Sequence, residues 1–390
     1  MMDFDFVNPT RIVFGEREEK EVGSLLAGYG YKKALLVYGG GSIKRMGLYD
    51  VVVHNLKEAN IVFSELSGVK ANPDISFVEE GLSMIRKDPI DVILAIGGGS
   101  VIDVAKSIAV SYFYEGDPLD FNRHLIAPKK ALPVAVILTI ASAGSESSDS
   151  CVISSYEKNF KGGFNSPLVR PLFAIEDPLL LKTVPVRQRN AGIVDMMMHS
   201  MERFFAKSIP FQLADDWALS LIKNVKSTAK ALLNDPNDVD SLSSLMLDSS
   251  LAHDGLTGLG KKQCFVVHPL EHALSGYRPD IIHGEGIAVC HLGWAHYVYK
   301  EDLPKFSRFA RFVFDIQENN DEKAAIMGIE AMESFYKELQ VPCSLRELGL
   351  SQKDIPSLAD LATGNGTRVI GCCPRSLNKE DVEKIYNLCL

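Results

Sequence analysis

The first half of the chain alternates short β-branched apolar runs with segments of helical periodicity, and this alternation constrains the fold most strongly. In residues 76–87, Val78, Leu82 and Ile85 recur at the spacing of one helix face. Strands that alternate with helices of this length predict βαβ units and a parallel sheet covered on both faces. The expected strands are residues 11–14, 34–38, 60–64, 91–96, 134–139 and 172–175.

After about Pro185 the pattern becomes helical, and no convincing strand intervenes. The expected helices are residues 185–206, 215–233, 241–251, 287–299, 321–339 and 379–388. Two of these have candidate N-caps: Asn237 or Asp238 for 241–251, and Ser376 or Asn378 for 379–388. The sequence therefore predicts an α/β domain with a parallel sheet over residues 1–184, followed by an all-α domain over residues 185–390.

Charge and composition narrow the possible partners and the compartment. The chain has 390 residues with 41 Lys and Arg against 50 Asp and Glu, a net charge of -9, which disfavours binding to nucleic acid or an anionic membrane. Its longest nearly apolar run, residues 132–141, is far shorter than the ~20 residues that span a bilayer. The seven cysteines form no CxxC pair, so we interpret them as buried or incidental thiols. With no signal peptide evident, we expect a cytoplasmic protein.

Two glycine clusters follow expected strands directly. Gly39, Gly40, Gly41 and Ser42 follow residues 34–38, and Gly97, Gly98, Gly99 and Ser100 follow residues 91–96 and lead into a helix. Glycine lets the backbone approach a phosphate, and the amide groups of a helix N-terminus bind anions. A single cluster often serves only the geometry of a turn. Two clusters at strand ends of one sheet favour a dinucleotide.

The helical half holds a carboxylate and several imidazoles at helical spacing. Asp195 and His199 are four residues apart, His268 and His272 repeat that spacing, and His283 follows. A carboxylate with several imidazoles suits Fe²⁺, Zn²⁺ or a similar divalent ion. From these residues alone, a capping or surface pair and structural histidines remain alternatives. We interpret the other histidines as structural: His54, His124, His253, His291 and His296.

Several motifs together resemble one family over almost the whole chain. They are VKANP at 69–73, GGGSVIDVAK at 97–106, LTIASAGSE at 138–146, DP at 177–178, AGIVD at 191–195 with His199, HPLEHALS at 268–275 and HGEG at 283–286. This set resembles the iron-containing (group III) alcohol dehydrogenases. Within that family the chain is most similar to the NADP-using, butanol-dehydrogenase-like members.

The resemblance implies the site residues. Asp195, His199, His268 and His283 fall on the ligands of one divalent metal ion, Fe²⁺ or Zn²⁺. His272 falls on an active-site histidine that does not bind the metal and would relay the hydroxyl proton. The implied cofactor-binding residues are Gly39, Gly40, Gly41, Ser42, Asn72, Gly97, Gly98, Gly99, Ser100, Asp103, Thr139, Ser148 and Lys161. From its place on the helix, Glu271 is expected to lie on a solvated face.

The implied reaction is reversible, metal-assisted hydride transfer between NADP(H) and a small primary alcohol or aldehyde. NADP(H) is expected over NAD(H), because NAD-preferring members often have Asp where Gly39 stands and an acid there would repel a 2′-phosphate. A homodimer is expected through pairing of the strand around residues 4–14. Two alternatives remain: a lyase related to dehydroquinate synthase, whose first metal ligand would be Glu, and a noncatalytic, metal-stabilised nucleotide-binding protein.

Overall fold

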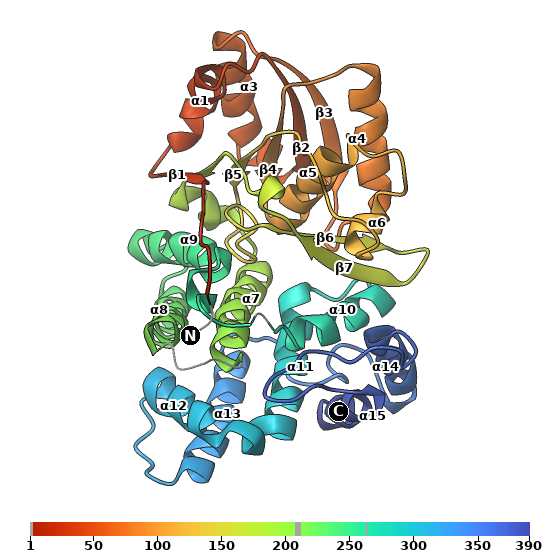
Figure 1. The fold of residues 1–390 in the computed structure, drawn as a ribbon. Helices are drawn as coiled ribbons and strands as arrows, with labels where there is room; N and C mark the ends of the chain where they lie inside the picture. Colours follow the sequence, from red (N-terminus) through yellow and green to blue (C-terminus); the bar gives the residue numbers. More distant parts are fainter. Residues whose placement is uncertain (1–2, 207–211, 263) are drawn as a thin grey trace.

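A six-stranded parallel sheet forms the upper half of the molecule in Figure 1. The computed structural model describes residues 3–206, 212–262 and 264–390. The sheet has the order β1-β8-β5-β4-β2-β3, and every neighbouring pair is parallel. The strands are β1 (Arg11–Phe14), β2 (Lys33–Gly39), β3 (Val62–Val69), β4 (Val92–Gly97), β5 (Val134–Leu138) and β8 (Phe173–Glu176). All six expected strands are confirmed. Strand β3 runs five residues past its expected end, because an edge strand accommodates polar residues such as Glu65.

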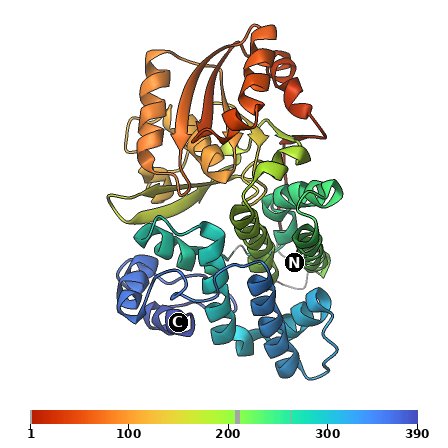
Figure 2. The same cartoon turned by 180° about the vertical axis from the view of Figure 1, so that it is seen from behind.

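Helices cover both faces of the sheet, as the alternation predicts. Leu35 and Val37 of β2 join a core with α4 (Ile75–Lys87) and α5 (Gly99–Ser111). Leu36, on the other face, packs with Val22 of α1 (Val22–Gly28) and Val52 of α3 (Leu48–Glu58). Figure 2 shows the two layers from behind. The short helices α2 (Ser42–Arg45) and α6 (Leu119–Asn122) lie in the connections.

An antiparallel hairpin that the sequence analysis does not predict lies between the two halves. Its strands are β6 (Ser150–Ser155) and β7 (Phe160–Asn165), and it packs against α5 and against α10 (Val267–Tyr277) (Figure 1). Strand β7 contains Gly162 and Gly163, which weaken the strand pattern. The hairpin is therefore an element of the first half that contacts the second.

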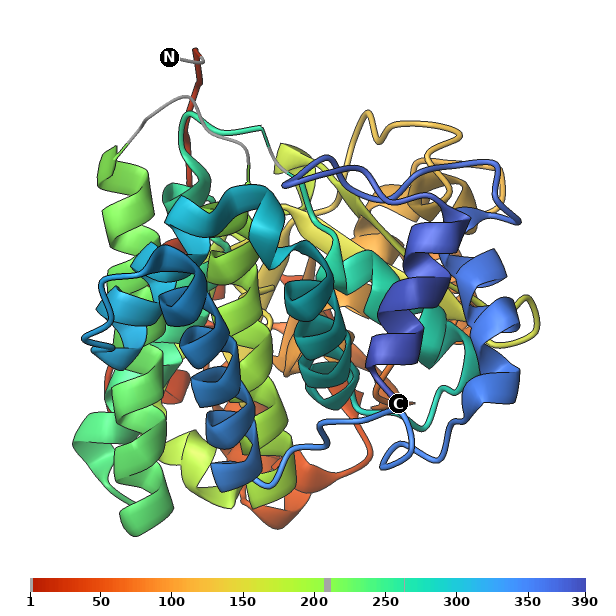
Figure 3. The same cartoon turned by 90° about the horizontal axis from the view of Figure 1, so that it is seen from below.

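The second half is helical, and α7 (Val186–Phe205) lies at its centre. Figure 3 shows α7 between its neighbours, which include α8 (Gln212–Asn234), α9 (Val239–His253) and α11 (His283–Val298). The remaining helices are α12 (Leu303–Phe314), α13 (Asp321–Glu338), α14 (Ile355–Thr363) and α15 (Lys379–Leu388). The 3₁₀ turns are Glu18–Glu21, Pro167–Val169, Pro178–Thr183, Leu256–Gly258, Tyr299–Asp302 and Gln352–Asp354.

All six expected helices of this half are confirmed, with ends shifted by a few residues. Asp238 caps α9 by accepting a hydrogen bond from the Ser241 amide, and Asn378 caps α15 with Asp381. Helix α11 begins at His283, four residues before its expected start, so this histidine is its first residue. Past residue 184 the described part of the chain contains no strand, and an isolated β-bridge joins Ile370 and Leu377. Among the described helices, none has the length and apolarity needed to cross a bilayer.

A pair of buried acids lies beneath the carboxyl end of the sheet. The Ser250 hydroxyl is 2.6 Å from Glu176 Oε1 and 2.9 Å from Glu146 Oε1. Glu176 is completely buried, and burial together with the neighbouring Glu146 raises the pKa of Glu176 from its ordinary 4.5 to about 8. The folded protein therefore holds a proton here at neutral pH.

Because the unfolded chain releases that proton at lower pH than the folded chain, Glu176 should reduce stability as pH rises. Between about pH 4.5 and 8 this group should lower the free energy of unfolding by up to about 1.4 kcal/mol per pH unit. We expect Glu176→Gln to flatten this slope, as measured by urea unfolding at pH 5, 6, 7 and 8. The exposed Glu79→Gln is the control. An unchanged slope in Glu176→Gln would contradict the protonated state.

Candidate metal and nucleotide site

Helix α7 carries Asp195 and His199 in its buried part. Both side chains are nearly inaccessible, and their four-residue spacing places them on one face. The His199 Nδ1 atom lies 3.0 Å from the Asp195 backbone carbonyl, to which it donates a hydrogen bond. This bond leaves the Nε2 atom of His199 available for a ligand.

Two further imidazoles converge on Asp195 from other helices. The Asp195 Oδ1 atom lies 3.5 Å from His268 Nε2, at the start of α10, and 3.7 Å from His283 Nε2, at the start of α11. Ligand atoms of Asp195, His199 and His268 all lie within 4.8 Å of one another. The structure thus brings three of the four expected ligands into one cluster and places His283 beside their carboxylate.

Two buried polar atoms in this cluster have no hydrogen-bond partner: Asp195 Oδ1 and His268 Nε2. A buried acceptor without a partner is costly, and a divalent cation would satisfy both atoms at once. The carboxylate is ionised, since the imidazoles outweigh the effect of burial and hold the pKa of Asp195 well below its usual range. The donor set, one carboxylate and imidazole nitrogens, fits Fe²⁺ or Zn²⁺.

A buried glutamate one turn beyond His199 orients the second imidazole. Glu202 Oε2 accepts a hydrogen bond from His268 Nδ1, and its Oε1 accepts from the backbone amides of Val266 and Val267. The ring is therefore held with Nε2 toward Asp195. Phe265 lies against the same ring at 5.1 Å between centroids.

A second glutamate does the same for His283. Glu271 contacts His283 Nδ1 and also accepts from Lys161 Nζ at 3.2 Å. The expectation that Glu271 lies on a solvated face is wrong: its side chain is completely buried, because the hairpin covers this side of α10. Burial raises the pKa of Glu271, but His283 and Lys161 lower it by more than burial raises it. The carboxyl group is therefore ionised.

His272 lies at the edge of this cluster and is half-buried. Its ring centroid is 5.7 Å from that of His283 and 6.5 Å from that of His268. Burial and the nearby Lys161 charge lower the pKa of His272, so its imidazole is neutral at neutral pH. His253, interpreted as structural from the sequence, packs against the His199 ring at 4.0 Å and accepts from Arg203.

The glycine loop after β4 has the close approaches that require glycine. Gly98 caps the N-terminus of α5, whose first two residues are Gly99 and Ser100. A Cβ atom on Gly97 would lie 2.6 Å from the Val101 side chain, and one on Gly98 would lie 3.1 Å from Ile140. Thr139, at the neighbouring strand end, donates its amide hydrogen to the Gly97 carbonyl at 3.0 Å. This loop is a bare helix N-terminus suited to a phosphate.

Residues 140–143 connect this loop to the metal cluster. Ile140 and Ala143 contact the glycine loop, and the Ser142 hydroxyl, between them, donates to Asp195 Oδ2 at 2.9 Å. A Cβ atom on Gly192 of α7 would lie 2.6 Å from the Ala141 carbonyl, so the helix passes close to this segment. The expected phosphate loop and the expected metal donors therefore lie on two sides of one short segment.

The second glycine cluster ends β2, which lies beside β4 in the sheet. Gly41 adopts a positive φ of 101° and caps the short helix that begins at Ser42. Gly40 has open space above it, whereas a Cβ atom on Gly39 would make a tight contact of 3.3 Å with the Val69 carbonyl oxygen. Lys44 extends over the Tyr49 ring nearby.

Four other expected cofactor residues have contacts within the protein. Asn72 donates to the carbonyls of Pro279 and Ile281, both at 3.0 Å. Lys161 donates to Asn72 Oδ1 and Ser275 as well as to Glu271.

The other two, Asp103 and Ser148, contact a buried loop. Asp103 accepts from the Ser145 hydroxyl and the Val152 amide. Ser148 is completely buried beside Lys106, whose amine binds the carbonyls of residues 145, 148 and 150. Ser148 thereby supports the loop.

Four residues of the site are not predicted from the sequence. They are Ser142, Glu202, Phe265 and Glu271, the last of which was expected on a solvated face. Glu202 follows His199 by three residues, which is the one sequence signal that places it on the same helix face. The contacts of Ser142 and Phe265 arise only from folding.

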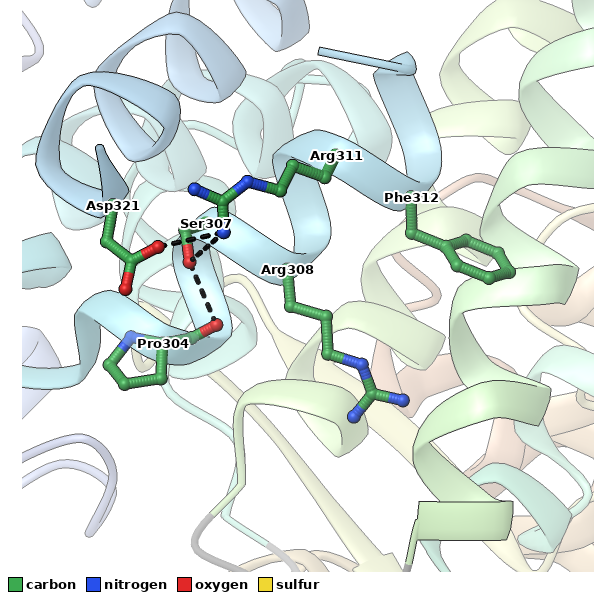
Figure 4. Close-up of a pocket in the computed structure, with 6 residues that line it drawn as sticks. All are labelled: Pro304, Ser307, Arg308, Arg311, Phe312 and Asp321. Carbon is green, nitrogen blue, oxygen red and sulfur yellow. Dashed lines mark hydrogen bonds and ion pairs between the residues drawn. The ribbon is translucent and has the colours of Figure 1, made fainter. Parts of the chain in front are cut away.

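A shallow hollow of about 470 Å³ lies elsewhere, in the helical half (Figure 4). Its charged groups are already paired: Arg311 binds Asp321 and Ser307, and Arg308 binds Asp216. The hollow therefore presents no unpaired cation of its own and does not coincide with the metal cluster.

Replacing Glu202 with Gln should weaken metal binding by about 10- to 100-fold, because the carboxylate that orients His268 is lost. Competition against a chelator measures this affinity, and Glu330→Gln, on the exposed face of α13, is the matched control. Unchanged affinity in a folded Glu202→Gln protein would contradict the orienting role.

Comparison with known proteins places this architecture in one family. The model "Iron-containing alcohol dehydrogenase" matches residues 9–178, and the model "Fe-containing alcohol dehydrogenase family, C-terminal" matches residues 190–390. The chain is 38% identical over 394 residues to the probable NADH-dependent butanol dehydrogenase 1 of Bacillus subtilis, covering 100% of both. It is 29% identical to the NADPH-dependent aldehyde reductase YqhD of Escherichia coli, covering 95% of both.

Among solved structures, NADH-dependent butanol dehydrogenase A of Thermotoga maritima matches with a TM-score of 0.96 at 34% identity, over 100% of this chain and 99% of the other. The match confirms the expected α/β and helical halves. It favours a dehydrogenase over the lyase and the noncatalytic nucleotide-binding protein. The chain belongs to the iron-containing alcohol dehydrogenase family and is an oxidoreductase of alcohols and aldehydes.

Proposed function

We propose that this chain transfers hydride reversibly between NADP(H) and a small primary alcohol or aldehyde, at one Fe²⁺ or Zn²⁺ ion held by Asp195, His199, His268 and His283. Residues 1–184 would bind the nucleotide and residues 185–390 the metal, in a cytoplasmic homodimer. The contacts made by Ser142 and its neighbours support this proposal most strongly. Its hydroxyl binds Asp195, while its neighbours contact the glycine loop of residues 97–99.

The bound groups and the chain have separate tasks. The metal ion supplies Lewis acidity toward the substrate oxygen, and the nicotinamide supplies or accepts the hydride. The glycine loop and the α5 N-terminus hold the diphosphate. Glu202 and Glu271 hold the rings of His268 and His283 in orientation. The neutral imidazole of His272 accepts the hydroxyl proton during oxidation and returns it during reduction.

The coenzyme preference rests on the end of β2. Gly39, Gly40 and Gly41 carry no acid that would repel a 2′-phosphate, and Lys44 and Arg45 are exposed nearby. Four similar proteins are named NADH-dependent butanol dehydrogenases and one is named an NADPH-dependent aldehyde reductase, so the names of relatives point in both directions.

Two features support the proposed dimer, and a third supports the proposed cytoplasmic compartment. Strand β1 is an edge strand that pairs only with β8 among the described strands, and Val7 and Phe14 are exposed at 65% and 40%. Pairing of two β1 edges across a two-fold axis would cover this surface. All seven cysteines are thiols, as is usual in a reducing compartment.

The proposed activity is tested with a panel of C2–C6 alcohols and aldehydes on the metal-loaded protein, with NADPH and NADH. We expect turnover in the wild-type protein and its loss in His268→Ala, because the side chain that bridges Asp195 and Glu202 is removed. NADPH binding, followed by nucleotide fluorescence, should stay nearly unchanged because the glycine loops lie in the other half. Wild-type activity and metal content in His268→Ala would refute the ligand assignment.

His272→Phe should lower kcat by about 10²- to 10⁴-fold with the metal still bound, because a proton relay is lost. Steady-state kinetics, metal analysis and thermal unfolding measure the three effects, and the exposed His296→Phe is the matched control. A joint loss of metal and stability in His272→Phe would instead assign this residue a structural role.

Gly39→Asp should shift the coenzyme preference toward NAD(H), since the new carboxylate lies at the end of β2, where the 2′-phosphate is expected. We expect the ratio of kcat/KM for NADPH to that for NADH to fall by about tenfold or more, about 1.4 kcal/mol. Gly28→Asp, which adds the same charge at the end of α1 in open space, should leave the ratio unchanged. A wild-type ratio that favours NADH would overturn the NADP(H) assignment.

A further inference from the structure

Three cysteines meet in the helical half: Cys372 and Cys373 of a loop near the end of the chain, and the distant Cys264. The sulfur atoms of Cys264, Cys372 and Cys373 all lie within 4.8 Å of one another, and those of Cys372 and Cys373 are 3.6 Å apart. Cys264 and Cys372 are 108 residues apart, so no spacing motif reveals the cluster. It shares no side chain with the Asp195 site.

One glycine, Gly371, allows the loop with Cys372 and Cys373 to approach Cys264. Gly371 has a φ of +63°, and a Cβ atom there would lie 2.3 Å from Val266 Cγ2. Without a side chain, the loop that follows rests directly on the segment containing Cys264. Two backbone hydrogen bonds of 2.9 Å between Ile370 and Leu377 close the same loop. The position of the two loop cysteines is therefore fixed by the backbone.

The surroundings favour thiolates over thiols once a cation is present. The Cys372 amide donates to Cys264 Sγ at 2.5 Å, as amides do around metal-bound sulfur. Lys305, whose amine binds the carbonyls of Phe204 and Ala206, acts electrostatically on Cys373. Burial and the neighbouring thiols raise the pKa of Cys264 above its ordinary value, so three thiolates at this spacing need a compensating positive ion.

We propose that Cys264, Cys372 and Cys373 form a second metal site, which takes a thiophilic divalent ion such as Zn²⁺. Zn–S bonds of about 2.3 Å place tetrahedral sulfurs about 3.8 Å apart, close to the 3.6 Å between Cys372 and Cys373 and within the 4.8 Å that bounds all three pairs. Binding replaces three S–H bonds with three metal–sulfur bonds and releases three protons to solvent. Because Cys372 is half-exposed, water supplies the fourth ligand.

Such an ion would join the C-terminal loop to the segment between Cys264 and His268. This segment carries Phe265, which stacks on the His268 ring at an angle of 23°. The second ion would thus stabilise the segment that leads into His268. Its role is structural, and the proposal does not depend on the proposed reaction.

Co²⁺ titration of the metal-free, reduced, full-length protein tests the site. Thiolate-bound Co²⁺ gives a sulfur-to-metal charge-transfer band in the near ultraviolet, which a centre of Asp and His ligands lacks. We expect this band, with one equivalent of Co²⁺ per chain beyond the ion of the Asp195 site. Its absence in the wild-type protein would overturn the proposal, without bearing on the dehydrogenase activity.

Variants locate the site. Cys372→Ser and Cys264→Ser should each lose the band and the additional equivalent, yet retain the other ion and alcohol oxidation. Cys343→Ser, a half-buried cysteine outside the cluster, should retain everything. Zn²⁺ should also raise the Tm of the wild-type protein more than that of Cys372→Ser. A band that persists in both cluster variants, or disappears in Cys343→Ser, would refute the assignment.

Discussion

The structure depends on a helix that is buried on all sides and still carries charged groups. From Arg189 to Phe205 every side chain of α7 is buried, so each polar group requires a partner from another element. Asn190 donates to the Leu339 carbonyl at 2.7 Å, and Arg203 donates to the His199 and Ala252 carbonyls. These bonds fix the surrounding helices relative to α7. Among the described residues, the atoms of α7 that lack a partner are Asp195 Oδ1, Asn190 Oδ1, Ser200 Oγ and the Nε atoms of Arg189 and Arg203. Of these, only Asp195 Oδ1 is an ionised acceptor that faces imidazoles from two other helices.

The protein's own hydrogen bonds orient the rings of the cluster. Each imidazole is held at Nδ1 by an acceptor: a backbone carbonyl for His199, Glu202 for His268 and Glu271 for His283. The Nε2 atoms of His268 and His283 consequently point toward Asp195. The rings separate Asp195 from the two glutamates, so carboxylates surround the position where the imidazole Nε2 atoms and Asp195 could hold a cation.

The fold and the principal donors could be predicted from the sequence, because they depend on local patterns. Apolar periodicity gave the six strands and six of the long helices, and the Asp195–His199 spacing placed two donors on one helix face. The resemblance to the family added His268 and His283. The hairpin could not be predicted, because Gly162 and Gly163 interrupt its pattern and its stability comes from α5 and α10. Glu271 was misplaced for the same reason, since only the hairpin buries it.

The hairpin also means that the two halves are one cooperative unit. Lys161 belongs to the first half by sequence, but its amine is compensated by Glu271 and donates to the Ser275 hydroxyl, both in the second half. A fragment that ended near residue 184 would leave this ammonium group without its partners, and the complementary fragment would leave a buried carboxylate uncompensated. We therefore expect the two halves to unfold together. A nucleotide that stabilises the sheet then also protects the metal-binding helices from proteolysis and hydrogen exchange.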